Sequence, residues 1–241
     1  ENYRRLLADP VFWNSLKVTV LYVVINIGVQ TLVALVIAVL MQRLTQSTVL
    51  RSLVLAPYLV SNVVAAIVFL WILDTQLGIF NIFLQWIGFD PIAFWASETW
   101  VIPTVALVNV WRHMGYTALL LFAGLQSIPN TVYEAGKMDG ASEWRILWTI
   151  AFPTSLPALT TVAIFAAVAS WNDFMGPLIY LQDQDVQTLS IGLQAFRSVN
   201  AQDVSFNLLM AASFLVILPL LVLFFVFQRY FIRGITIGGF K

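Results

Sequence analysis

The sequence predicts an all-α, polytopic membrane helix bundle. Of its 241 residues, 60% are hydrophobic and only 10% are charged, and the mean hydropathy is +0.87. Soluble domains carry about a quarter charged residues, so this chain lacks the charge to cover a globular surface. Long uncharged stretches also recur along the chain, each with the length that a helix needs to cross a bilayer. Lipid must therefore be most of the solvent of this protein.

Charge-free stretches locate five spanning helices. Four of them are bounded by charged residues, and the fifth carries Arg112 and His113 in its middle. A helix crosses the hydrocarbon core with about 20 apolar residues. We expect spans at about 15–42, 50–73, 100–127, 156–180 and 206–231.

The stretch 75–89 is also uncharged but is too short to span the membrane upright. Its composition favours a helix that lies at the membrane interface, with Phe80, Phe83 and Trp86 toward lipid. A buried re-entrant turn is the alternative.

Loop charges predict the orientation. The turn 42–51 and the tail 229–241 carry basic residues and no acid, whereas the loop 74–98 carries acids and no base. By the positive-inside rule the first two are cytoplasmic and the third is external. Five spans then leave Glu1 outside despite Arg4 and Arg5 nearby, so we expect one more span before Glu1 in the full subunit, six in all.

Composition excludes several classes of function. The chain has no Cys, a single His and a formal net charge of zero. Thiol chemistry and a His-cluster metal site are therefore excluded, and nothing indicates nucleic-acid binding. The GxxxxGK[ST] pattern of a nucleotide-binding loop is absent as well. We expect no catalytic residue, no metal and no resident cofactor.

The most informative segment is polar and lies between two apolar stretches, with the sequence EAGKMDGASEWRILWTIAFP over residues 134–153. Thr131 is a plausible N-cap for a short helix 132–138, and Gly140 suits the left-handed conformation that ends a helix. A second, amphipathic helix is expected over Ser142–Ile150. A helix–Gly–helix element with exposed apolar and acidic groups fits a groove on a partner protein outside the membrane. An amphipathic loop on the membrane surface is the simpler alternative.

The spacing of this segment resembles the EAA motif of ABC-importer permeases. The matching positions are Glu134, Ala135, Gly140, Ile150 and Pro153, while Gly136 and Phe152 replace the Ala and Leu of that pattern. The resemblance implies a cytoplasmic coupling loop at 128–155, within a single permease domain 1–241, on which a separate ATPase docks. The implied docking residues are Glu134, Ala135, Gly136, Asp139, Gly140, Ala141, Ile150 and Pro153.

The resemblance extends along the chain. The stretches FWNSLKVT, AGLQSIPNTVYEAGKMDGA, WNDFMGPLIYL and QRYFIRGITIGGFK look like carbohydrate-importing permeases of the maltose-transporter type. This implies the type I ABC importer permease fold, a multi-pass protein of the bacterial inner membrane. It also implies four kinds of partner: a cytoplasmic ATPase dimer that binds the ATP, a second permease, an extracytoplasmic solute-binding protein and a carbohydrate. The tail resembles the shorter of two paired permeases, but region 50–130 looks more like the longer one.

Polar residues within the spans are candidates for the solute pathway, because ionisable groups there are costly. Sugar recognition needs hydrogen-bonding groups and flat apolar faces, which Trp171-Asn172-Asp173 supplies together. Gly176 and Pro177 follow and are expected to break that helix. We also expect Arg112 and Asp173 to pair or to share a water-filled cavity; the alternative is that each binds backbone carbonyls separately. The candidate set is Trp171, Asn172, Asp173, Asn62, Arg112 and Tyr116, with Asn26, Gln30, Asn109 and Trp111 as weaker additions that equally fit helix packing.

The expected function is a permease that forms half of an alternating-access pathway for a sugar or related polyol, driven by a separate ATPase. Because of Arg112, an anionic solute such as glycerol phosphate is a close alternative. An ion-coupled secondary transporter is a further one, in which Asp173 alone offers the intramembrane carboxylate, and no inverted repeat is visible.

Overall fold

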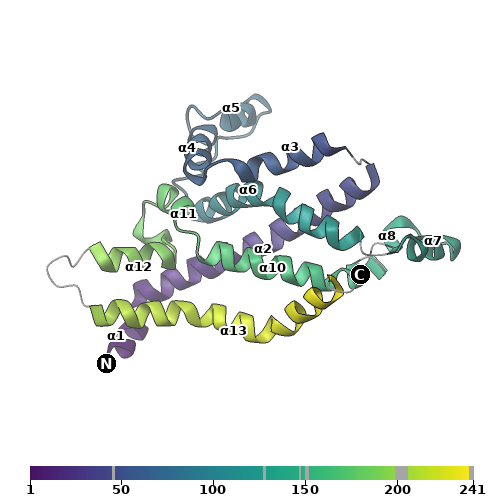
Figure 1. The fold of residues 1–241 in the computed structure, drawn as a ribbon. Coiled ribbons are helices and arrows are strands. Elements are labelled where there is room, and N and C mark those ends of the chain that lie inside the picture. The colour runs from purple at the N-terminus through teal and green to yellow at the C-terminus, as the bar shows by residue number, and fades with distance from the viewer. Residues whose placement is uncertain (45–46, 127–128, 147, 150–151, 199–205, 239–241) are drawn as a thin grey trace.

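The computed structural model describes residues 1–44, 47–126, 129–146, 148–149, 152–198 and 206–238, and these residues form helices and connecting turns (Figure 1). The predicted all-α class is confirmed. The long helices run side by side along one axis, with α7 and α8 projecting at one end of the bundle. The elements are α1 (Asn2–Ala8), α2 (Pro10–Leu44), α3 (Thr48–Leu59), α4 (Asn62–Ile72), α5 (Ile79–Trp86), α6 (Glu98–Gln126), α7 (Asn130–Met138), α8 (Glu143–Ile146), α9 (Phe152–Thr154), α10 (Leu156–Trp171), α11 (Met175–Tyr180), η2 (Gln184–Val186), α12 (Leu189–Ser198) and α13 (Phe206–Gly238).

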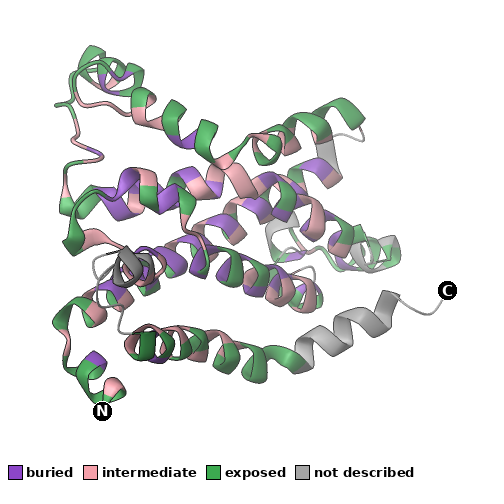
Figure 2. Ribbon diagram, turned by 60° about the vertical axis from the view of Figure 1, so that its left-hand side comes forward, coloured by how far each residue is buried: buried purple, intermediate pink, exposed green. Residues whose placement is uncertain are grey.

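Helices α2 and α6 form the centre of the bundle and pack against each other along their length. Ala34 and Ala38 of α2 and Ala118 of α6 are fully buried in one apolar cluster. Small side chains let helix backbones approach closely within a membrane. Helix α10 packs on α2 and α6 as well, so the buried residues concentrate along these three helices (Figure 2).

Three of the predicted spans are confirmed as continuous helices. By length and composition, α2, α6 and α13 are each apolar enough to cross a membrane, and α3 with α4 makes a fourth span if the bent pair is counted as one. The other two predicted spans, 50–73 and 156–180, are interrupted in the structure.

The interruption of 50–73 lies at Val60 and Ser61, where α3 and α4 meet at 90°. Both residues are extended, with ψ of 135° and 139°, so the prediction of one straight helix was wrong. Pro57 lacks a backbone N–H and removes one helical hydrogen bond just before the bend. Ser61 then stands at the N-cap position of α4, where Ser is favoured.

The interruption of 156–180 lies between Trp171 and Met175. We expected Gly176 and Pro177 to break this helix, and that expectation was wrong. Both residues lie within the first turn of α11, where a proline is tolerated because its missing N–H has no helical partner. The break comes earlier, at Asn172, whose side-chain amide donates to the Val168 carbonyl at 2.8 Å.

Short helices surround the bundle. Helix α5 confirms that the stretch 75–89 contains a helix, and Phe80, Phe83 and Trp86 on it are exposed. Its position at the membrane interface stays a prediction. Asn81, fully buried, ties this loop together through hydrogen bonds with the backbone of Asp74 and Ile92. The sequence analysis missed α1 and α12, although the apolar residues of α12 lie on one face of that helix.

Candidate functional site

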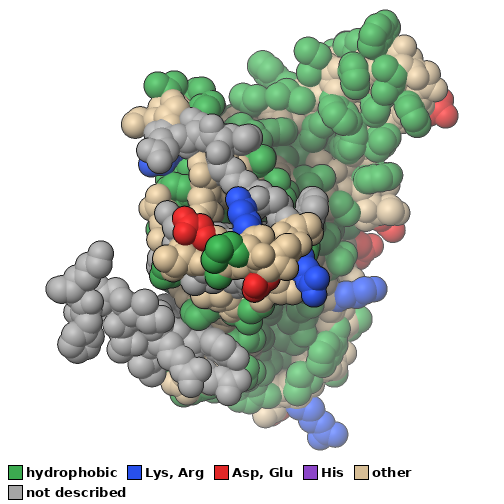
Figure 3. Space-filling model, turned by 90° about the vertical axis from the view of Figure 1, so that its right-hand side faces the viewer, with side chains coloured by type: hydrophobic (Ala, Val, Ile, Leu, Met, Phe, Trp, Pro, Cys, Tyr) green, Lys and Arg blue, Asp and Glu red, His purple; other side chains and the backbone are tan. Residues whose placement is uncertain are grey.

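The segment 128–155 projects from one end of the bundle, where acidic and basic side chains gather between hydrophobic flanks (Figure 3). Helix α7 begins at Asn130 after Pro129, so the prediction that Thr131 caps it was wrong. Proline just before or at the start of a helix loses no helical hydrogen bond, which explains why the helix begins earlier. Glu134 and Ala135 are exposed on α7.

The end of α7 follows the prediction closely. Gly140 has φ of +74°, the left-handed conformation that glycine adopts without strain. The Ala141 N–H donates to the carbonyl of Gly136 at 3.0 Å, and the Gly140 N–H donates to that of Lys137 at 3.0 Å. These bonds pair carbonyls that the helix end leaves free. Gly136 is buried, whereas Asp139 is exposed, so the chain turns sharply while its acidic side chain stays accessible.

The second predicted helix of the segment, Ser142–Ile150, is described only in part. Helix α8 covers Glu143–Ile146 of it, with Ile146 fully buried, and residues 147 and 150 lie outside the described residues. The Thr149 hydroxyl donates to the Arg145 carbonyl at 2.6 Å and so competes with the backbone for that acceptor. Trp148 is about half exposed and packs against Phe152 at 5.2 Å between ring centroids. Ile150 lies outside the described residues, while Pro153 is exposed in α9.

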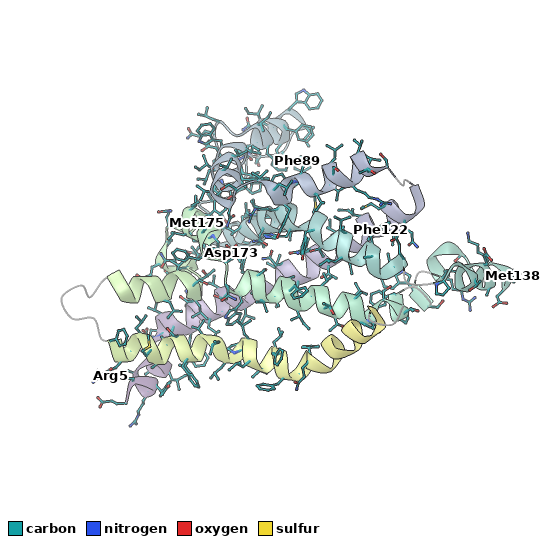
Figure 4. The ribbon with its side chains drawn as sticks, viewed as in Figure 1. Arg5, Phe89, Phe122, Met138, Asp173 and Met175 are labelled. Atoms are coloured by element: carbon teal, nitrogen blue, oxygen red, sulfur yellow. The ribbon has the colours of Figure 1, made fainter. Side chains whose placement is uncertain are left out.

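At the other functional region, Asp173 lies inside the bundle, far from Met138 at the tip of α7 (Figure 4). Its Oδ2 atom accepts hydrogen bonds from the Tyr22 hydroxyl at 2.7 Å and from the Asn109 amide at 2.9 Å. Tyr22 of α2 is almost fully buried. The carboxylate therefore links the α10–α11 break to both central helices. Sequence reasoning missed Tyr22, although a tyrosine within an apolar span signals a hydroxyl that needs a partner.

The three consecutive candidates around Asp173 point to different places. The buried Trp171 indole donates to the Val216 carbonyl of α13 at 3.1 Å, so this ring packs between helices. Asn172 is exposed and lines a groove beside α12 and α13 together with Trp171. Only Asp173 faces the centre. The structure therefore keeps Trp171 and Asn172 at one groove and places the Asp173 carboxylate at another site.

Arg112 and Asp173 do not form the expected ion pair. The Arg112 Nε atom donates to the Val60 carbonyl at 3.1 Å. The alternative of a backbone carbonyl partner therefore holds for Arg112, whereas Asp173 accepts hydrogen bonds from the side chains of Tyr22 and Asn109.

A cavity of about 270 Å³ lies between α2, α3, α6 and α10, next to the Asp173 cluster. The rings of Tyr58 and Tyr116 stack on one of its walls at 4.9 Å, and His113 meets Tyr58 edge-on at 5.8 Å. The Ser170 hydroxyl is buried there without a hydrogen-bond partner. Other polar lining residues are Gln30, Asn109 and Thr117.

This cavity contains only some of the sequence candidates. Tyr116 lines it, while Asn62 lies at the start of α4, with its Oδ1 facing Gly176. Tyr58 was missed because a single tyrosine near a helix end has no distinctive pattern. Among the described residues, no three His, Asp or Glu side chains converge as metal ligands would.

Apolar spans, a polar cavity within them and a charged element projecting at one end define a multi-pass membrane transport component. Residues 30–237 match the family of binding-protein-dependent transport system inner membrane components, and the chain belongs to that family. The resemblance to importer permeases seen in the sequence is thus confirmed.

Relatives with established names are sugar permeases. The melibiose/raffinose/stachyose import permease protein MelC of Bacillus subtilis is 37% identical over 135 residues, 56% of this chain and 48% of that protein. The diacetylchitobiose uptake system permease protein NgcG of Streptomyces coelicolor is 32% identical over 58% of this chain and 46% of that protein. The trehalose/maltose transport system permease protein MalF of Thermococcus litoralis is 31% identical over 84% of this chain and 69% of that protein. The chain thus spans about half the length of several relatives that it matches.

Solved structures agree on the fold. A chain of a bacterial alginate ABC transporter, in complex with its periplasmic protein, superposes with a TM-score of 0.83 at 20% identity, covering 98% of this chain and 83% of that chain. A chain of an amino acid ABC transporter superposes with a TM-score of 0.59 at 15% identity, covering 97% and 98%. The fold is that of ABC importer permeases, and this likeness concerns the fold alone.

Proposed function

We propose that this chain is the permease subunit of an ABC importer and forms half of an alternating-access pathway for a carbohydrate. A separate ATPase pair supplies the energy, and a solute-binding protein delivers the sugar to the outer face. The pathway is completed by a second permease.

The observation that carries the carbohydrate assignment is the cavity beside Asp173. Its stacked rings, Tyr58 and Tyr116, offer the flat faces on which the C–H side of a sugar ring packs. Ser170 provides a buried hydroxyl without a partner, and Asn109 provides an amide at the same cavity. Sites for small polar molecules combine such apolar walls with a few placed hydrogen-bonding groups. The names of the relatives point to the same class of solute.

The coupling role belongs to the segment 128–155. It projects from the bundle at one end and combines the exposed Glu134 and Asp139 with the exposed ring of Trp148. Apolar and acidic groups on a rigid turn suit insertion into a groove on the ATPase, in which the charges provide specificity. Movement of the ATPase dimer would then be transmitted through α7 and α8 to α6 and α10.

The position of Arg112 gives no support to an anionic solute. Arg112 suggested an anion site, but its Nε atom bonds the Val60 carbonyl, and Arg112 does not line the cavity described above. An ion-coupled secondary transporter is disfavoured by the family to which the chain belongs.

The first test is co-purification of the tagged subunit from native membranes, followed by mass spectrometry and an ATPase assay. We expect an ATPase and a second permease with the wild type, and loss of the ATPase with Glu134→Lys or Gly140→Pro. Arg5→Met, on the distant α1, is the matched control that should retain both partners. A stable lone subunit without ATPase activity would contradict the proposal.

The second test addresses the solute. In vesicles containing the purified complex, uptake of labelled trehalose, melibiose and glycerol phosphate should separate the solute classes. Tyr116→Ala should raise the KM for the transported sugar because one aromatic face is lost, whereas Tyr3→Phe should not change it. Uptake of glycerol phosphate alone would favour the anionic alternative.

A further inference from the structure

Both interrupted spans place their breaks beside one turn of α6. Asn109 and Arg112 are three residues apart on that helix, so their side chains leave neighbouring positions of its surface. Asn109 donates to the Asp173 carboxylate at the α10–α11 break, at 2.9 Å. Arg112 donates to the Val60 carbonyl at the α3–α4 break, at 3.1 Å. One turn of α6 therefore donates a hydrogen bond to each of the two helix breaks.

The carbonyl of Val60 needs such a donor. In a continuous helix it would accept from the N–H four residues later, but the chain bends by 90° at this point. The first backbone bond after the bend runs from the Ala65 N–H to the Ser61 carbonyl at 2.9 Å. No water is present in the hydrocarbon core to pair a free carbonyl, so the Arg112 guanidinium supplies the missing donor. A charged donor makes this hydrogen bond stronger than a neutral one.

The outer halves of the two broken spans pack against each other. Helix α4 contacts α11, and Ala66 and Tyr180 from these helices share one buried cluster. A Cβ atom on Gly176 would lie 3.7 Å from the Asn62 Oδ1 atom, which shows how closely the two helix starts approach. Helix α3, the other half of the first broken span, is held by a different contact. Gly115 of α6 lies directly on the Val54 carbonyl of α3 and leaves no room for a Cβ atom. Helix α3 is thus fixed on α6, while α4 depends on its bend.

We propose that Arg112 is a positioning residue, not a solute contact: it fixes the bend between α3 and α4 and thereby the pairing of α4 with α11. The cavity supports this assignment, because Asn109 and His113 line it but Arg112 does not. The inference rests on the proposed function only where transport is measured. In transport, the α4–α11 pair sets the shape of the pathway on the outer side.

The structural test uses cross-linking. The chain contains no Cys, so Asn62→Cys with Gly176→Cys gives a defined pair in the complex with its native partners. A short bifunctional methanethiosulfonate should join the two thiols within the subunit. Arg112→Met should lower the cross-linking rate by roughly tenfold, the shift expected when a charge-assisted hydrogen bond is lost. Arg112→Lys should give an intermediate rate, because lysine keeps the charge but not the planar donor group.

The matched control is Arg51→Met, which removes an arginine from the opposite end of the same interrupted span. Arg51 packs over the ring of Phe122 at 4.7 Å and lies away from the bend. Its substitution should leave the cross-linking rate near that of the parent. Rates are compared only for complexes that elute as a single folded species. An unchanged rate in Arg112→Met, or an equal fall in Arg51→Met, would overturn the proposal.

Transport kinetics separate positioning from solute contact. In the complex without the two introduced cysteines, Arg112→Met should lower the maximal uptake rate and leave the KM for the sugar unchanged. A raised KM with an unchanged cross-linking rate would identify Arg112 as a solute contact and overturn the proposal. The cross-linking measurement needs neither solute nor ATP, so it tests the bend even if no sugar is transported and the proposed function fails.

Discussion

Helices α6 and α13 are both long enough to cross a membrane, yet they are built on different principles. The apolar part of α6 is less hydrophobic than that of α13, yet half of its residues are buried, whereas only 11% of the α13 residues are. Helix α6 contacts protein on several sides and carries Asn109, Arg112 and Thr117, all with partners on other helices or at their breaks. Helix α13 presents large apolar side chains outward.

Of these two spans, the less hydrophobic one lies at the centre of the bundle, where it contacts other helices. Polar side chains are costly toward lipid and are retained where other helices provide partners. A span such as α13 needs only to be apolar, so many substitutions should be neutral there. Substitutions in α6 should be costly, and the following predictions test that contrast from the largest expected effect to the smallest.

The largest effect is expected for Gly115→Val in α6. The new side chain would collide with the backbone at Val54, which cannot move aside as a flexible side chain does. Overpacking costs about 1–3 kcal/mol and more where backbone must shift, so we expect loss of at least that much unfolding free energy in a detergent titration. The matched substitution Val222→Leu on the exposed face of α13 should change the unfolding free energy by less than about 0.5 kcal/mol. Equal effects at the two sites would refute the contrast.

A smaller effect is expected for Thr117→Val, which keeps the shape but removes the hydroxyl. The buried Gln30 amide of α2 donates to Thr117 Oγ1 at 2.7 Å and would lose this acceptor. We expect a loss of about 1–2 kcal/mol in unfolding free energy, measured by the same titration. Ser213→Ala in α13 is the control, since that hydroxyl bonds the Leu209 carbonyl of its own helix at 2.8 Å. A cost for Ser213→Ala as large as that for Thr117→Val would count against the argument.

The next effect is expected in the loop after α6, where a substitution at Gly140 strains the backbone. Gly140→Ala places a side chain on a residue with φ of +74°, which costs about 1 kcal/mol. We expect weaker co-purification of the ATPase, with little change in the thermal stability of the bundle. Gly28→Ala is the control, because a Cβ atom there meets no other atom within 4 Å in the middle of α2. If both substitutions weaken co-purification equally, the conformation of Gly140 is not the cause.

The smallest effect concerns the loop before α6. Backbone N–H groups of Leu77 and Gln76 donate to the Asp74 carboxylate and lower its pKa below the ordinary value. A group whose pKa is lowered by folding stabilises the folded state above its unfolded pKa, about 3.9 for Asp, and this contribution is lost as the pH falls through the folded pKa. Thermal unfolding of the wild type should therefore lose stability below about pH 4 relative to Asp74→Ala. Because Asp74 is partly exposed to solvent, the difference should be small, and parallel pH profiles would show that these hydrogen bonds contribute nothing.

Some features of the segment 128–155 were predictable because they depend on local chemistry. The left-handed glycine at Gly140 is confirmed, since glycine adopts that conformation without strain. The start of α7 was not predicted correctly. Helix starts shift by a residue or two where a residue such as Pro129 offers a competing solution.

The candidate pathway residues were harder to predict than the turn at Gly140. Trp171 and Asn172 have the side chains that sugar recognition needs, but both line a groove beside α13 and not the cavity next to Asp173. Arg112 was expected to find a charged partner and instead bonds a carbonyl that exists only because α3 and α4 are bent. No sequence window contains that information.

By itself, the sequence determined that this protein is an all-helical membrane protein and where its apolar stretches lie. These properties follow from side-chain hydrophobicity, helix periodicity and the conformational freedom of glycine, which act over one or two turns. Only the tertiary structure decided that two spans are interrupted, that Tyr22 and Asn109 share the Asp173 carboxylate, and that Tyr58 stacks on Tyr116. Those contacts join helices far apart in the chain, so their positions depend on how whole helices pack.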